Sequence, residues 1–147
     1  MNFRVFLAPF VALCVLALDQ ISKAWVLSLS FVSKEIIPGC FNLTFVTNPG
    51  SVWGIGTQYT QYLAVLGVLA SLLLFFFMLK ISSLQDKLLC ACLLGGILGN
   101  TIDRFVQGYV VDFLDFYIKT WHWPCFNIAD IAITSVCLLF LFRKSKA

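Results

Sequence analysis

Charged residues are scarce in this chain of 147 residues, and histidine is almost absent. Only 12% of the residues are charged, against about 25% in a typical soluble domain, and His122 is the single histidine. The net charge of +3 is small and its basic residues are scattered, which argues against a nucleic-acid-binding surface. Without a histidine cluster a metal site has little support. We therefore expect no metal and no other cofactor.

Apolar residues, by contrast, make up 61% of the chain, more than a soluble globule of this size could bury. Four apolar runs of about 17–25 residues predict membrane-spanning helices. A cleaved signal peptide is the alternative for the first run, but no pair of small residues closes it and DQISK follows. We expect one all-α membrane domain over residues 1–147, with spans at about 5–26, 60–80, 88–106 and 126–143.

The placement of lysine and arginine predicts that both termini are cytoplasmic. This orientation puts six basic residues inside and four outside, with the cluster of Arg143, Lys144 and Lys146 directly after the last span. The first external connection, residues 27–59, contains FNLTFVT (41–47), whose alternation predicts a small β-element. The second, residues 107–125, joins the third and fourth helices and carries aromatic residues typical of the membrane interface.

The six cysteines show no metal-binding spacing. Four of them lie within apolar runs, where cysteine behaves as a small hydrophobic residue. Cys40 and Cys125 fall in the two external connections, so the sequence leaves a disulfide between them open.

Polar residues of the apolar runs gather near the predicted external face. Such residues are costly in a span and normally face a protein interior or a water-filled cavity. Spacings of three or four residues put Asp19 with Lys23, and Asn127 with Asp130, on shared helix faces. The pattern predicts a polar pocket just below the outer surface. Its expected members are Asp19, Lys23, Asn48, Asn100, Asp103, Arg104, Asp112, Asn127 and Asp130.

Two of these residues, Asp112 and Asp130, are the strongest candidates for chemistry. Both have apolar neighbours, in VVDFL and FNIAD, and neither has a basic residue within four positions. Two desolvated carboxyl groups brought together share a proton, which provides an acid and a base able to activate water against an amide carbonyl. We expect Asp115, in contrast, to be solvated and His122 to be an interfacial residue without a catalytic role.

Simpler interpretations stay open for several members of the pocket. Asp19 and Lys23 are equally well explained as an interfacial ion pair, and Asp103 with Arg104 as a structural pair. Asn127 could serve only as the N-cap of the last helix. A transporter using the two aspartates as an ion site is a different class of function, disfavoured because no inverted repeat is visible and the carboxylates gather on one side.

Five motifs follow one another along the chain: DQISK (19–23), TNPGSVWG (47–54), GGILGNTIDR (95–104), VVDFLDF (110–116) and FNIADIAI (126–133). In this order, with four spans and this length, they resemble the lipoprotein signal peptidases, also called signal peptidase II. The resemblance covers nearly the whole chain. One motif departs from the family pattern, because Ser51, Val52 and Trp53 stand where the family usually has alanine and phenylalanine. This change affects the expected substrate preference more than the expected activity.

The resemblance implies an aspartic endopeptidase of the bacterial cytoplasmic (inner) membrane, with its site near the external, periplasmic face. Its substrates would be diacylglyceryl-modified prolipoproteins, cleaved just before the lipidated cysteine. Expected partners are these substrates, membrane lipid and globomycin-type inhibitors; no nucleic acid is expected, and the protein is expected to be monomeric. Asp112 and Asp130 would be the catalytic pair. The residues that would bind substrate or support the site are Asn48, Gly50, Asn100, Arg104, Asn127, Asp19, Lys23 and Asp103.

Overall fold

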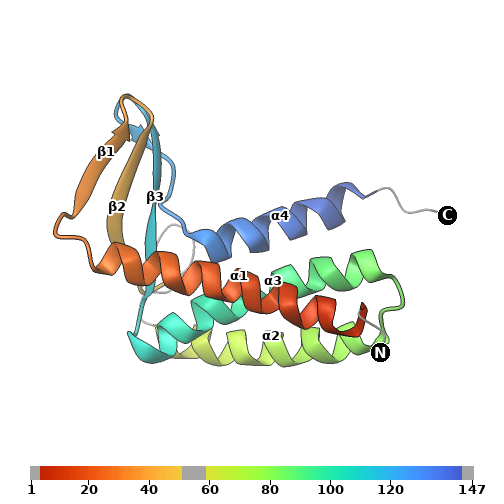
Figure 1. The fold of residues 1–147 in the computed structure, drawn as a ribbon. Coiled ribbons are helices and arrows are strands. Elements are labelled where there is room, and N and C mark those ends of the chain that lie inside the picture. Colours follow the sequence, from red (N-terminus) through yellow and green to blue (C-terminus); the bar gives the residue numbers. More distant parts are fainter. Residues whose placement is uncertain (1–3, 51–58, 144–147) are drawn as a thin grey trace.

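The computed structural model describes residues 4–50 and 59–143 of the chain. This part folds into a bundle of helices with an antiparallel sheet standing at one end (Figure 1). In chain order the elements are α1 (Arg4–Leu27), β1 (Ser33–Ile37), β2 (Phe41–Asn48), α2 (Thr60–Lys80), α3 (Leu84–Val106), β3 (Val110–Ile118), β4 (Trp121–His122) and α4 (Ile128–Phe142).

Three of the helices are long and apolar enough to cross a membrane. These spans are Phe6–Leu27 within α1, Thr60–Lys80 and Leu84–Val106, so the first three predicted helices are confirmed as helices of spanning length. The fourth, α4, is apolar but has only 15 residues. At 1.5 Å per residue it is about 22 Å long, shorter than the roughly 30 Å hydrocarbon core. Its crossing of the membrane stays a prediction.

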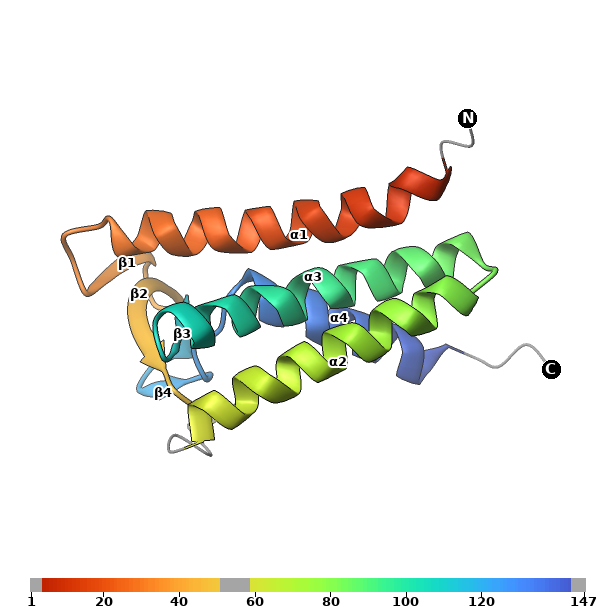
Figure 2. The ribbon, with the colours of Figure 1, turned by 90° about the horizontal axis from the view of Figure 1, so that it is seen from below.

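The central helix of the bundle is α3, which contacts α1, α2 and α4 (Figure 2). Glycines permit this close approach. A Cβ atom added at Gly95 would lie 2.6 Å from the carbonyl oxygen of Ala12, and one added at Gly96 would lie 2.7 Å from that of Ala129. Small residues at such contacts let helices pack in lipid without a hydrophobic driving force between them.

The sheet has the strand order β1-β2-β3-β4 and draws on both external connections. The predicted β-element over residues 41–47 is confirmed, but the sequence did not reveal that the second connection supplies β3 and β4. Pairs Phe41↔Phe116 and Asn48↔Val110 mark the two ends of the β2–β3 ladder. The first half of β3 is buried on both faces, so it lacks the alternation by which a half-buried strand is predicted.

The end of the bundle opposite the sheet carries basic residues. There Arg143, which follows α4, pairs with Asp86 in the first turn of α3, and Ser83 caps α3 by accepting from the Asp86 N–H. All six cysteines lie within the described ranges and are free thiols. The alternative of a Cys40–Cys125 disulfide is therefore wrong.

Candidate active site

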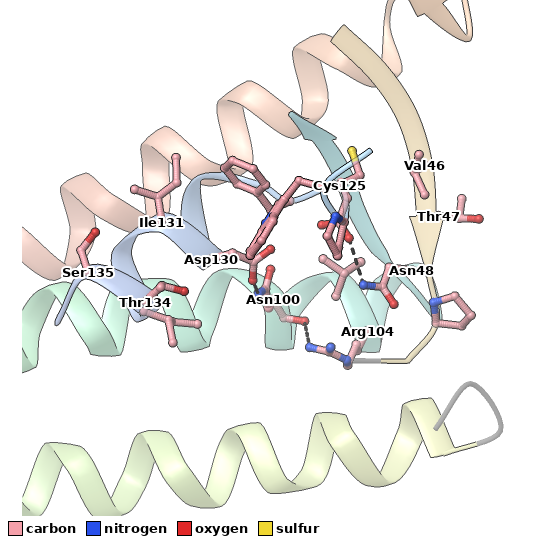
Figure 3. A pocket seen from close by; sticks show the side chains of 17 residues that line it. Val46, Thr47, Asn48, Asn100, Arg104, Cys125, Asp130, Ile131, Thr134 and Ser135 are labelled. Atoms are coloured by element: carbon pink, nitrogen blue, oxygen red, sulfur yellow. Dashed lines mark hydrogen bonds between the residues drawn. The ribbon is translucent and has the colours of Figure 1, made fainter. Parts of the chain in front are cut away.

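A cavity of about 810 Å³ lies where the sheet meets the helices (Figure 3). Its walls come from β2, β3, the segment after β4, and the facing sides of α3 and α4. Polar side chains line one part of it: Asn48, Asn100, Arg104, Asp112 and Asp130. Apolar side chains line another part: Val46, Val110, Pro124, Phe126, Ile131 and Ile133. The cavity can therefore receive a ligand with one polar and one apolar portion.

Asp112 on β3 and Asp130 in the first turn of α4 are joined through a single residue, Asn127. The Asn127 side-chain amide donates to Oδ1 of Asp112 at 2.7 Å, and its backbone N–H donates to Oδ2 of Asp130 at 3.2 Å. The side-chain oxygen of Asn127 also accepts from the Asp130 N–H at 2.9 Å, which completes a capping box at the start of α4. Asn127 is thus both the N-cap of the helix and the bridge between the two carboxyl groups.

Each of the two carboxyl groups receives a further amide hydrogen bond. Asn48 Nδ2 donates to Oδ2 of Asp112 at 2.9 Å, and Asn100 Nδ2 donates to Oδ1 of Asp130 at 2.8 Å (Figure 3). The pKa of Asp112 is raised to about 7, chiefly by burial; the nearby negative charge of Asp130 also raises it, and the Asn48 hydrogen bond lowers it. Asp112 therefore holds its proton well above the usual range of an aspartate.

A buried lysine is connected to this pair through a single residue, Asn100. Lys23 Nζ lies 2.7 Å from Oδ2 of Asp19 and 2.8 Å from Oδ2 of Asp103, and donates to Oδ1 of Asn100 at 2.9 Å. With its oxygen facing the ammonium group, the Asn100 amide must turn its NH₂ toward Asp130. Lys23 therefore orients Asn100.

Asp19 and Asp103 both belong to this buried cluster. Asp19 accepts from the Ala129 N–H at 2.9 Å, which ties α1 to the first turn of α4. Asp103 pairs with Lys23, so its interpretation as the partner of Arg104 is wrong. The ion pair expected between Asp19 and Lys23 is present, and both of its side chains are almost fully buried.

Arg104 holds the chain just after β2. Its Nη2 donates to the Gly50 carbonyl oxygen at 2.9 Å and its Nη1 to the Asn100 carbonyl oxygen at 3.1 Å. The Gly50 N–H in turn donates to Oδ1 of Asn48 at 3.1 Å, which leaves Nδ2 of Asn48 to face Asp112. Ser51, Val52 and Trp53, where the motif departs from the family pattern, lie outside the described residues.

The site therefore gathers nine polar or charged side chains, with the backbone of Gly50, from α1, α3, α4, β3 and the end of β2. Residues 11–145 match a family model described as signal peptidase (SPase) II. The chain belongs to this family. Lipoprotein signal peptidases of Burkholderia mallei (strain SAVP1) and of Paraburkholderia phytofirmans are each 39% identical to it, over 94% of this chain and 88% and 85% of their own. A solved structure of a bacterial membrane enzyme is similar over 95% of this chain and 93% of its own, with a TM-score of 0.83 and 27% identity.

Family membership and the apolar helices together make this a multi-pass bacterial membrane protein. The ten residues that the sequence predicts for the site of this signal peptidase II family member all lie in one connected region of the structure. Among the described residues no group of three or more histidine, cysteine, aspartate or glutamate side chains could hold a metal ion.

One residue of the structure differs from what the sequence suggested. Asp115 is not solvated, because only 8% of its surface is exposed and it accepts from Asn42 Nδ2 at 2.9 Å. It also contacts Nδ1 of His122 at 2.7 Å. A register prediction for the second connection would have found this cluster, since Asn42 pairs with Asp115 and Tyr117 with His122 across the strands.

Gln20 was likewise overlooked. Its amide donates to Oδ1 of Asp103 at 2.8 Å and more weakly to the Gly99 carbonyl oxygen at 3.3 Å. It lies within DQISK, between the aspartate and the lysine of that motif. Its position beside the buried cluster makes it a further support of Asp103.

Proposed function

We propose that this protein is an aspartic endopeptidase that removes the signal peptide from diacylglyceryl-modified prolipoproteins, cleaving before the lipidated cysteine. Its family and its relatives of the same activity support the peptidase function. The observation that carries the catalytic assignment is the bridge through Asn127, whose two N–H donors contact Asp112 and Asp130. Two carboxyl groups held by one residue, beside a cavity, provide the acid and base that hydrolysis of an amide requires.

In the proposed mechanism a water molecule lies between the two carboxyl groups and the scissile carbonyl. Asp130 takes a proton from this water while the oxygen of the water bonds to the carbonyl carbon. At the same time Asp112 gives its proton to the carbonyl oxygen. The tetrahedral intermediate then collapses: the C–N bond breaks, Asp130 passes its proton to the leaving nitrogen, and Asp112 regains its proton from the hydroxyl group. Both side chains return to their starting states.

Asp112 is assigned the resting proton for a physical reason. Burial raises its pKa to about 7, so near neutral pH a large fraction of it is protonated. Asp130 lies in the first turn of α4, where the helix N-terminus stabilises a negative charge, and it accepts from Asn100 Nδ2 and from the Asn127 N–H. An ionised carboxylate at this position suits a general base.

The remaining residues have supporting roles in this proposal. Asn48 and Asn127 orient Asp112, while Asn100 orients Asp130 and is itself oriented by Lys23. Asp19 and Asp103 compensate the buried charge of Lys23. Arg104 fixes the backbone at Gly50, next to Pro49, which lines the cavity, and Gly50 would contact the substrate backbone there.

The proposed setting is the bacterial inner membrane, crossed four times, with both termini in the cytoplasm. The basic residues near the Asp86–Arg143 pair support a cytoplasmic location for that end. The sheet and cavity then lie near the periplasmic face. The acyl chains of the substrate would remain in the bilayer beside the α4 residues Ile131 and Thr134, which line the cavity. We also propose that the protein acts as a monomer and that globomycin-type cyclic peptides occupy the same cavity.

The decisive experiment is hydrolysis of a diacylated prolipoprotein by the purified protein in detergent. Asp112→Asn and Asp130→Asn should each abolish cleavage while thermal unfolding shows a folded protein. Asp86→Asn, the same chemical change at the far end of the bundle, should leave cleavage unchanged. Full activity in either variant of the pair would refute the assignment, and loss of activity with a chelator would favour a metal mechanism instead.

A further inference from the structure

A second polar cluster lies on the sheet, apart from the cavity. Asp115, with Asn42 opposite it on β2, lies three residues after Asp112 on β3. Successive side chains of a strand point to opposite faces, so Asp115 and Asp112 belong to opposite faces of β3. The mechanism proposed above uses only the face with Asp112. The members of the second group, here called the back cluster, are Glu35, Asn42, Asp115, Tyr117 and His122, and they come from all four strands.

Within the back cluster, Asp115 and His122 are held firmly. Asp115 contacts His122 Nδ1 through one oxygen at 2.7 Å and Asn42 Nδ2 through the other at 2.9 Å. The His122 ring stacks on Tyr117, with ring centroids 5.0 Å apart and an angle of 15° between the planes. The backbone of β4 pairs with β3 at only two positions, Tyr117↔His122 and Ile118↔Trp121. The side-chain pair is therefore a large part of what holds β4 in place.

The residues directly after His122 form one wall of the cavity. Trp123, Pro124, Cys125 and Phe126 all line it. The far end of this wall is fixed by backbone hydrogen bonds between Phe126 and Leu114. The near end is fixed by the Trp123 N–H, which donates to the Phe116 carbonyl oxygen at 2.8 Å, and by His122.

Asn127, the bridge of the catalytic pair, does not depend on this near end. It is held by Asp112, by Oδ1 of Asn100 at 3.2 Å and by the Val111 carbonyl oxygen at 3.3 Å. Loosening β4 should therefore move the wall and leave the two carboxyl groups in place.

We propose that Asp115 and His122 are positioning residues that hold the cavity wall of residues 123–126 and so set the affinity for the apolar part of the substrate. This inference rests on the proposed peptidase function for its substrate, but its structural half stands without it. Neither residue takes part in bond breaking. Their effect therefore belongs to substrate binding and not to the chemical step.

Steady-state cleavage kinetics separate these two effects. His122→Ala and Asp115→Ala should each raise KM about fivefold and leave kcat within about twofold. His122→Asn places an amide N–H near the position of Nδ1 and should keep KM close to that of the unchanged protein. Glu35→Gln is the matched control, since Glu35 is a carboxylate of the same cluster that contacts Tyr117 and the Gly39 N–H but not Asp115.

Cys125 provides a readout that needs no cleavage. Burial raises the pKa of its thiol to about 12, and because the thiolate is the reactive form, a maleimide should label it slowly while the wall is closed. Labelling at Cys125, located by mass spectrometry, should accelerate at least about fivefold in His122→Ala and Asp115→Ala. It should stay slow in His122→Asn and Glu35→Gln.

The outcomes are distinct. Unchanged KM and unchanged Cys125 labelling in both alanine variants would overturn the inference. A fall in kcat at constant KM, with a lower unfolding temperature, would also overturn it, because the pair would then serve only the stability of the fold. If the unchanged protein failed to cleave prolipoprotein at all, the proposed function would be wrong, yet the labelling rates would still decide whether the pair holds the wall.

Discussion

Replacing Asp112 by asparagine removes a titrating group from a buried position beside the cavity, and the stability of the variant should depend on pH in a specific way. The folded-state pKa of Asp112 is raised from 3.8 to about 7, chiefly by burial. The folded protein therefore binds more protons than the unfolded chain between about pH 4 and pH 7, and its stability falls as the pH rises through this window. Moving a pKa from 3.8 to about 7 corresponds to about 4 kcal/mol.

Asparagine is neutral at every pH, so the Asp112→Asn variant avoids this cost. Its free energy of unfolding, relative to that of the unchanged protein, should rise by about 1.4 kcal/mol per pH unit between about pH 4 and pH 7 and then level off. A constant offset is also expected, because an amide has one acceptor oxygen where Asp112 now accepts from both Asn48 and Asn127. The test therefore depends on how the difference in free energy of unfolding changes with pH, and not on its absolute value.

The measurement is denaturant unfolding in detergent, followed by tryptophan fluorescence, across this pH range. Glu35→Gln is a control of opposite sign, since hydrogen bonds from Tyr117 and the Gly39 N–H lower the pKa of Glu35. The stability that Glu35 contributes is lost as the pH falls below its unfolded pKa of 4.5, so the stability deficit of this variant should grow as the pH rises to about 5 and stay constant from there to pH 7. A stability difference for Asp112→Asn that is constant, or that shrinks with rising pH, would refute the raised pKa.

Two further predictions concern the buried cluster around Lys23. Lys23→Met should lower kcat at least about tenfold and move the pH–activity profile upward, because the charge of Lys23 lowers the pKa of Asp112; a loss of equal size at every pH would contradict this role. Gly99→Ala should cost about 1–3 kcal/mol of stability, since the added Cβ atom would lie 2.4 Å from Oδ2 of Asp19. Unfolding at the same denaturant concentration as the unchanged protein would show that Asp19 can move aside.

The candidate site was largely predictable from the sequence for two reasons. Buried polar groups in apolar helices are costly, so Asp19, Lys23 and Asn100 stand out against their neighbours. Helical spacing then assigns Asn127 and Asp130 to one face. The bundle follows from the apolar runs in the same way, because length and composition alone define a helix that can cross a bilayer.

The sequence could not predict which residues from different segments contact one another. Arg104 follows Asp103 in sequence, yet Asp103 pairs with Lys23 from another helix, while Arg104 reaches the backbone of Gly50. Strand β3 was missed because its first residues are buried on both faces and show no alternation. Without the register of β3 and β4, Asp115 resembled a solvated residue of a loop.

The capping box at Asn127 links the formation of α4 to the assembly of the proposed catalytic pair. The capping box that starts α4 joins Asn127 to Asp130, and the same Asn127 donates to Asp112, so the first turn of α4 places the two carboxyl groups of the proposed catalytic pair together. During synthesis and insertion, a chain that has added α1, α2, α3 and the sheet but not α4 still lacks the second carboxyl group. Peptidase activity should therefore appear only when the final helix is in place.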